Sequence, residues 1–248
     1  MGTSQSSKGP KNGAPLVPPW ADNTNPMTGG EGAQLKDFRT SMGKYVKNRD
    51  RNNLRKALGQ YSKKATGGGQ TASKRMSSVI QAGGNLFGLL DSGTITSEGE
   101  VFTLSDFIGR TCEEVIARIS HFLAGNDGDS EKINSAINQA LSEAFEGSDN
   151  FKADIITDDL IIATMINYLS ESIFLQITGD TGQSWNNADT TKQLQDAETD
   201  LREVINVIVD NYMRPKIDKK DYHFSVKEIN KIQKEVIVDI WNEWENYL

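Results

Sequence analysis

Nucleophilic and metal-dependent catalysis usually relies on cysteine and histidine, and this chain has only three such residues: Cys112, His121 and His223. Cys112 and His121 are nine residues apart on one predicted helix. At about 100° per residue they lie on opposite faces and cannot pair locally. Three residues are too few for a structural zinc site unless carboxylates join them. We therefore expect packing or surface roles for all three, and neither a metal nor a cofactor.

Two glycine-containing stretches match ligand-binding loops only in part. The stretch Gly67-Gly68-Gly69-Gln70-Thr71 lacks the Gly-Lys-Ser/Thr sequence and the preceding strand of a Walker phosphate loop. The stretch Asn126-Asp127-Gly128-Asp129 would place Leu123 and Gly125 at two ligand positions of a calcium loop, where neither side chain can ligate. We interpret the many carboxylates of the later segments as a solvated acidic face, although an acid–base pair among them stays open. The chain is therefore predicted not to be an enzyme.

Positive charge is concentrated in residues 34–75, which carry twelve Lys or Arg and two Asp, a net charge of +10. Residues 76–248 carry thirteen Lys or Arg and thirty Asp or Glu, a net charge of −17. A basic segment of this kind could contact the acidic part of the chain, an acidic partner or nucleic acid. The expected contact residues are Arg51, Arg55, Lys56, Lys63, Lys64, Lys74 and Arg75. An overall pI near 5.0 makes nucleic acid the less favoured of these partners.

Composition and length point to a cytoplasmic protein. The chain has 248 residues, enough for a sizeable core, and one cysteine, so an internal disulfide is impossible. No apolar signal segment follows Met1, and no run reaches the roughly 18 apolar residues of a membrane span. The start matches a myristoylation pattern with Ser6 in place, which leaves an acylated adaptor as a further alternative. We otherwise expect no membrane contact.

Apolar residues recur at helical spacing through most of the chain, and no strand-period run competes with them, which predicts an all-α fold. The predicted helices cover residues 35–64, 71–90, 105–124, 130–145, 158–177, 191–213 and 225–244. Residues 91–103 are predicted to form a loop or a short extended piece. Pro215 is expected to bar continuation of its helix, and Ser225 with Glu228 forms a predicted capping box. Gly83, Gly84 and Gly88 suggest close backbone packing.

The predicted organisation has three segments. Residues 1–33 are dominated by Gly, Ser, Pro, Asn and Thr and are expected to form a flexible, disordered tail. Residues 34–75 form a basic helical segment with a Gly-rich turn, and residues 76–248 form an acidic multi-helix body. The exception within the tail is the apolar island Pro15-Leu16-Val17-Pro18-Pro19-Trp20, which favours polyproline II.

Three stretches within roughly the first 80 residues form a recognisable combination. They are Met1-Gly2-Thr3-Ser4, the island Pro15-Leu16-Val17-Pro18-Pro19-Trp20, and Ala65-Thr66-Gly67-Gly68-Gly69-Gln70-Thr71-Ala72-Ser73-Lys74-Arg75-Met76. Together they resemble the QatB family of the bacterial Qat antiphage defence system. The resemblance implies neighbours in the same system: an ATPase (QatA-type), a QueC-like protein (QatC-type) and a TatD-like nuclease. QueC enzymes activate a carboxylate with ATP and convert it through an amide to a nitrile.

The resemblance gives the tail a specific hypothesis. Met1 is expected to be removed because Gly2 is small. The freed α-amine, with a pKa of about 7.7–8.0, would be partly neutral and nucleophilic at physiological pH. Gly2 would then serve as acceptor in the QueC-like active site, with Trp20 as an anchor and Thr3 and Ser4 threading beside it. The chain is accordingly predicted to be a non-catalytic adaptor whose tail is a docking peptide or modification substrate.

Overall fold

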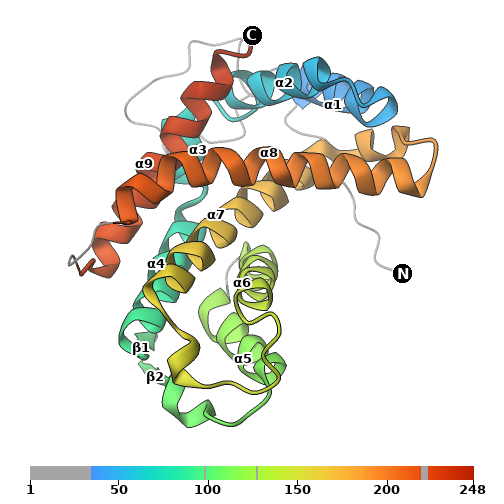
Figure 1. Ribbon diagram of the computed structural model, residues 1–248. Helices are drawn as coiled ribbons and strands as arrows, with labels where there is room; N and C mark the ends of the chain where they lie inside the picture. Colours follow the sequence, from blue (N-terminus) through green and yellow to red (C-terminus); the bar gives the residue numbers. More distant parts are fainter. Residues whose placement is uncertain (1–34, 98, 127, 219–222) are drawn as a thin grey trace. The chain divides into compact units, whose positions relative to one another are not determined.

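The computed structural model describes residues 35–97, 99–126, 128–218 and 223–248. Within these ranges the chain is helical apart from one short hairpin, so the predicted helical fold is confirmed (Figure 1). The tail residues singled out above, from Gly2 to Trp20, lie outside the described residues.

Contacts divide the chain into two compact units. Unit 1 takes its described residues from Met1–Met76, Gln176–Val204 and Glu235–Leu248, and unit 2 comprises Ser77–Leu175 and Ile205–Lys234. The three segments predicted from the sequence, which end at residues 33, 75 and 248, were separated by composition and charge. The two units are instead defined by contacts between residues. As a result, the basic segment shares one compact unit with two later parts of the acidic segment.

Unit 1 begins with α1 (Leu35–Asn48), α2 (Arg51–Gln60), the π-turn η3 (Tyr61–Ala65) and α3 (Gly69–Arg75). It also holds the end of α7 (Asp158–Thr181), η6 (Gly182–Asn187), the first part of α8 (Thr191–Ile217) and the last part of α9 (Val226–Glu245). The apolar residues that recur at helical spacing in the basic segment are all buried: Leu35, Phe38, Met42, Tyr45, Val46, Leu54, Leu58 and Tyr61. Helical periodicity therefore identified the inner face of the basic segment correctly.

The predicted helix over residues 35–64 is interrupted at Arg49. This residue adopts a φ of 58°, and Asp50 then caps α2 by accepting a hydrogen bond from the Asn52 main-chain N–H. A non-glycine residue at positive φ ends one helix and turns the chain into the next. The apolar spacing continues across this break, which is why periodicity alone did not reveal it.

The Gly-rich turn predicted at residues 67–69 is present and tightly packed. Gly67 and Gly68 have φ values of 78° and 91°, which side chains with a Cβ rarely adopt. Thr66 Oγ1 accepts a hydrogen bond of 2.7 Å from the Trp241 indole of α9. A Cβ placed on Gly69 would lie 2.9 Å from the main-chain Cα and O of Val238. The glycines let the chain approach α9 at backbone distance, which accounts for this motif without a bound phosphate.

Unit 2 begins with α4 (Ser77–Ser92), the antiparallel strands β1 (Thr94–Ser97) and β2 (Glu100–Thr103), and η4 (Leu104–Phe107). It continues with α5 (Cys112–Ala124), α6 (Ser130–Ala144), η5 (Ala153–Ile155) and most of α7. The close packing predicted at the glycines of α4 is confirmed at Gly83. A Cβ there would lie 2.2 Å from Gln233 Oε1 and 2.7 Å from Tyr168 Cε1.

Of the two alternatives for residues 91–103, the extended one is present, because residues 94–97 and 100–103 form a short hairpin. Two local predictions need correction. The helix expected from residue 105 begins only at Cys112, where the Thr111 side chain caps it. Pro215 does not bar its helix, because α8 continues to Ile217. A proline in the last turn removes a single helical hydrogen bond, and the Asp218 N–H closes that turn onto the Arg214 carbonyl at 2.8 Å.

The predicted capping box of α9 is confirmed. The Ser225 N–H donates to the Glu228 carboxylate at 2.8 Å, and the Glu228 N–H donates to Ser225 Oγ at 3.3 Å. These two bonds satisfy main-chain donors that a helix N-terminus leaves unpaired. The start of the C-terminal helix α9 is thus fixed by local sequence alone.

Among the described residues, one helical span is long and apolar enough to cross a membrane: Asp158–Asn187, with a mean hydropathy of 1.5. Of its most apolar window, 61% is buried inside the protein. Ile166, Leu169 and Ile173 are each less than 9% exposed. The span therefore has the burial of a core helix, as its sequence predicts.

Replacing Gly69 with alanine should destabilise the protein. The added methyl group would meet the Val238 backbone, which cannot move aside like a flexible side chain. Overpacking of this kind costs about 1–3 kcal/mol of unfolding free energy. Urea unfolding of Gly69→Ala measures the change. Gly128→Ala is the matched control, because a Cβ at Gly128 meets no atom within 4 Å. Equal stabilities for the two variants would contradict the close approach.

Candidate functional site

A buried carboxylate, Asp180, joins the basic segment to the end of α7 within unit 1. The Tyr61 hydroxyl donates to Asp180 Oδ2 at 2.8 Å, and Gln176 Nε2 donates to the same oxygen at 3.1 Å. Arg75 Nη2 lies 3.0 Å from the carboxylate, whose side chain is only 11% exposed. A buried carboxylate is stable only when it is paired and hydrogen-bonded, so these donors must stay in place.

Arg39 of α1 reinforces the same junction through the main chain. Its Nε donates to the Asp180 carbonyl at 2.8 Å, and its own carbonyl accepts a hydrogen bond of 2.9 Å from Ser184 Oγ. A guanidinium beside the last carbonyls of a helix is favourable because those groups carry partial negative charge. Helix α1 is therefore held against the end of α7 independently of the side-chain cluster.

The tyrosine of this cluster is a stable hydrogen-bond donor. Burial, followed by the negative charge of Asp180, raises the pKa of the Tyr61 hydroxyl well above its ordinary value, and Arg75 only partly opposes this. The hydroxyl therefore keeps its proton at physiological pH and continues to donate to Asp180. The cluster therefore stabilises the packing of unit 1 and does not have the properties of an acid–base pair.

Another arginine of the basic segment, Arg49, forms a second ion pair within unit 1. Arg49 pairs with Asp200 of α8, and the Tyr45 hydroxyl donates to the same carboxylate at 3.1 Å. Burial and the Asp200 charge raise the pKa of Tyr45. Arg49 and Arg75 thus serve to hold unit 1 together, and their charges are offset inside the chain.

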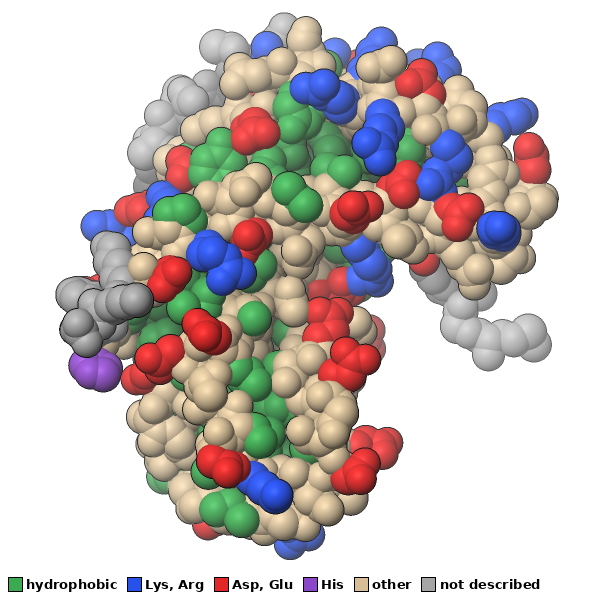
Figure 2. Space-filling model, viewed as in Figure 1, with side chains coloured by type: hydrophobic (Ala, Val, Ile, Leu, Met, Phe, Trp, Pro, Cys, Tyr) green, Lys and Arg blue, Asp and Glu red, His purple; other side chains and the backbone are tan. Residues whose placement is uncertain are grey.

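Six other cations of the segment form an exposed surface, which we call the basic face. Its members are Lys44, Lys47, Arg51, Arg55, Lys56 and Lys63. None of their side chains forms an ion pair with a described residue, and Figure 2 shows Lys and Arg gathered over α1 and α2. The Arg55 guanidinium lies 4.7 Å from the centre of the Tyr247 ring, a contact that orients it without neutralising it.

The structure brings together only part of the predicted contact set. Arg51, Arg55, Lys56 and Lys63 are exposed and belong to the basic face. Lys64 is paired with Asp37 at 2.9 Å, and this hydrogen bond lowers the pKa of Asp37. Arg75 is paired with Asp180. Lys74 is half-buried on α3. The surface available to a partner is therefore smaller than the sequence suggested and is centred on α1 and α2.

The cysteine and both histidines belong to unit 2, whereas the basic face belongs to unit 1. Cys112 is buried at the start of α5, and burial raises the pKa of its thiol, which disfavours the reactive thiolate. His121 and His223 are exposed. The residues that the structure describes include no group of three or more His, Cys, Asp or Glu placed to hold a metal ion.

Sequence reasoning missed two features. Asp180 lies at the edge of the polar stretch 178–190, where nothing distinguishes it from exposed acids. The second feature is a hollow beside α5, lined in part by Glu114, Arg118 and Phe122. Their spacing of four residues places them on one helix face, a signal that a helical plot of α5 would have shown.

Comparison with known proteins finds one family model that matches most of the chain. A family model described as "QatB: Qat anti-phage system associated protein QatB" matches residues 67–243. This match covers the helical remainder that motif comparison left unassigned, and it overlaps the earlier resemblance only at residues 67–80. No curated protein and no solved structure matches significantly.

Replacing Asp180 with asparagine should weaken unit 1. The Arg75 guanidinium would lose its ion pair with Asp180 in a largely buried position, and breaking such a pair costs up to about 3–5 kcal/mol. Because Arg75 keeps 25% of its side chain exposed, we expect roughly 2–3 kcal/mol by denaturant unfolding. The control is Asp196→Asn, an exposed position on α8. A change below about 0.5 kcal/mol for Asp180→Asn would contradict the structural role of the cluster.

Proposed function

We propose that this chain, which belongs to the QatB family of Qat anti-phage system proteins, is a non-catalytic adaptor of that system. The adaptor would bind a QueC-like (QatC-type) protein through its N-terminal region and would also meet the ATPase (QatA-type) of the same system. Its place of action would be the cytoplasm.

The observation that carries the adaptor proposal is the basic face. It lies on α1, α2 and η3, the first three described elements, and therefore follows the tail directly in the chain. Six exposed cations without ion-pair partners among the described residues repel one another, and an acidic surface relieves that repulsion. The tail and the basic face together would form one continuous recognition region.

The tail would contribute either docking contacts or an acceptor for chemistry. In the second case the QueC-like partner would supply a carboxylate activated as its adenylate. The neutral α-amine of Gly2 would attack the activated carbonyl carbon; the new C–N bond would form, the C–O bond to AMP would break, and the amine would lose a proton. The product is an amide on Gly2, and no oxidant or further reactant is needed.

The intact mass of the protein tests the tail as a substrate. Purified together with its genomic neighbours, the protein should carry an added acyl group that maps to Gly2, whereas protein expressed alone should not. Gly2→Leu should remain unmodified, because a large second residue retains Met1. An unmodified Gly2 in both preparations would contradict acylation and leave docking as the role of the tail.

Charge reversal tests the basic face and separates the adaptor from the alternative of nucleic-acid binding. The triple variant Arg51→Glu, Arg55→Glu and Lys56→Glu should lose co-purification with the QueC-like partner. A control of equal charge change reverses the exposed lysines Lys152, Lys227 and Lys234, all of unit 2.

The nucleic-acid alternative rests on the same exposed cations and makes a different prediction. Binding of a labelled DNA or RNA strand would weaken steeply as salt rises, because each neutralised phosphate releases a counter-ion. Binding of that kind, lost in the basic-face variant while the partner still co-purifies with it, would overturn the adaptor assignment of this surface.

A further inference from the structure

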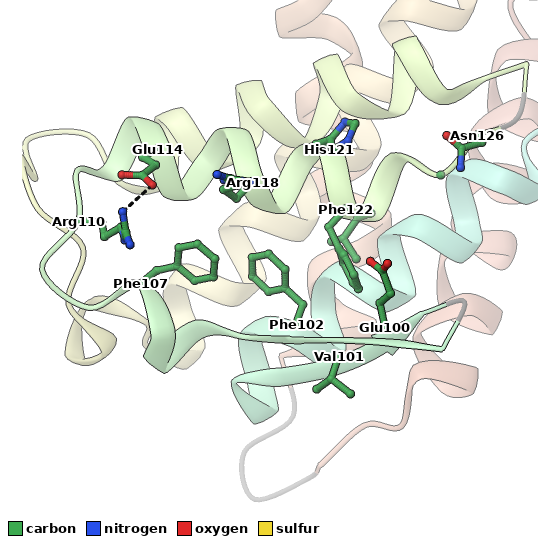
Figure 3. A pocket seen from close by; sticks show the side chains of 12 residues that line it. Glu100, Val101, Phe102, Phe107, Arg110, Glu114, Arg118, His121, Phe122 and Asn126 are labelled. Carbon is green, nitrogen blue, oxygen red and sulfur yellow. Dashed lines mark hydrogen bonds and ion pairs between the residues drawn. The ribbon is translucent and has the colours of Figure 1, made fainter.

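Unit 2 contains a hollow of about 650 Å³ between strand β2 and helix α5. Figure 3 shows aromatic side chains from the strand, from η4 and from the helix meeting in this space. The volume lies within the range of about 300–1,000 Å³ that is usual for small-molecule sites. All the lining residues belong to unit 2, so the hollow is complete within one compact unit.

The floor of the hollow is a row of three phenyl rings. Phe102 stacks on Phe107 with ring centres 4.9 Å apart and an interplanar angle of 10°, and Phe122 lies 5.0 Å from Phe102 on the other side. Phe107 and Phe122 are only half-buried, although phenylalanine normally loses most of its surface on folding. The row therefore offers ring faces and edges to a planar group entering the hollow.

Charged groups of both signs border the rings. Arg118 is exposed and forms no ion pair with a described residue, whereas Arg110 is paired with Glu114 at 3.0 Å. In Figure 3 the Arg110–Glu114 pair lies beside Phe107, and Glu100 lies at the other end of the row beside Phe122. Neither Arg118 nor Glu100 forms an ion pair with a described residue, so the hollow presents a guanidinium above the rings and a carboxylate at one end that no described side chain neutralises.

We propose that this hollow binds a nucleoside monophosphate whose base carries an amino group. The base would stack on the phenyl row, an interaction worth about 1–3 kcal/mol per base. The Glu100 carboxylate would accept hydrogen bonds from the amino edge, and the Arg118 guanidinium would bind the phosphate through charge-assisted hydrogen bonds. Each of the three parts of the ligand meets one of the three kinds of group in the hollow.

A peptide with one aromatic and one acidic side chain would offer part of the same chemistry. It would have to order two flexible side chains, at about 0.5–1.5 kcal/mol each, and it would leave Glu100 without a donor unless a third group reached it. A compact nucleotide carries ring, amino group and phosphate on a nearly rigid frame. The arrangement therefore favours the nucleotide.

Calorimetric titration of the full chain with GMP, AMP, CMP and UMP tests the proposal. We expect saturable binding of the three nucleotides with amino groups, and weaker binding of UMP. Arg118→Gln should weaken binding roughly tenfold or more, because a charge-assisted contact is lost. Glu100→Gln should reduce the preference over UMP. The matched control is Arg214→Gln, an exposed arginine on α8 paired with Asp210 and outside the hollow.

Several outcomes would overturn the inference. They are the absence of saturable binding by any of the four nucleotides, equal weakening by Arg118→Gln and Arg214→Gln, and binding of inorganic phosphate as tight as that of the nucleotides, which would show that the rings contribute nothing. Binding of a single-stranded oligonucleotide but of no mononucleotide would also overturn it, in favour of a strand-binding surface. Thermal unfolding of each variant beside the wild type shows whether a loss of binding reflects the site or the fold.

Discussion

The Asp180 carboxylate receives hydrogen bonds or ion pairs from residues that are far apart in the sequence. Tyr61 belongs to η3, Arg75 to α3 and Gln176 to α7, while Arg39 of α1 reaches the carbonyl of the same residue. Because a buried carboxylate requires these partners, the helices that carry them have one arrangement around it. The basic segment, which taken alone would be a set of short, mutually repelling helices, becomes part of a compact unit through this contact.

The distribution of positive charge on the surface follows from that constraint. Arg49 and Arg75 form ion pairs with acids of later segments, and these pairs help to hold unit 1 together. The cations of the basic face occur on the side of α1 and α2 opposite to the buried stripe. They form no ion pair with any described residue. The division between structural and available cations is therefore set by helical geometry, since residues on the inner face meet acids and residues on the outer face meet water.

Sequence reasoning recovered the features that local rules determine. Helical spacing identified the buried stripe of α1, and the Ser225 capping box located the start of α9. The sequence did not reveal features that depend on contacts between residues far apart in the chain. Nothing near Asp180 in the sequence indicates that Tyr61 and Arg75 surround it. For residues 91–103 the sequence leaves a loop and a short extended piece open, because strands as short as those of the hairpin show too little period-two pattern to decide. The hollow beside α5 was missed for the same reason, because two of its three rings come from outside the helix.

The central claim is that the tail and the basic face form the partner-binding region. Hydrogen–deuterium exchange of the protein, alone and in complex with the QueC-like partner, tests it most directly. The account predicts slower exchange on binding in residues 1–33 and in α1 and α2, with unit 2 unchanged. Protection confined to unit 2, with the tail and the first two helices exchanging as in the free protein, would contradict it.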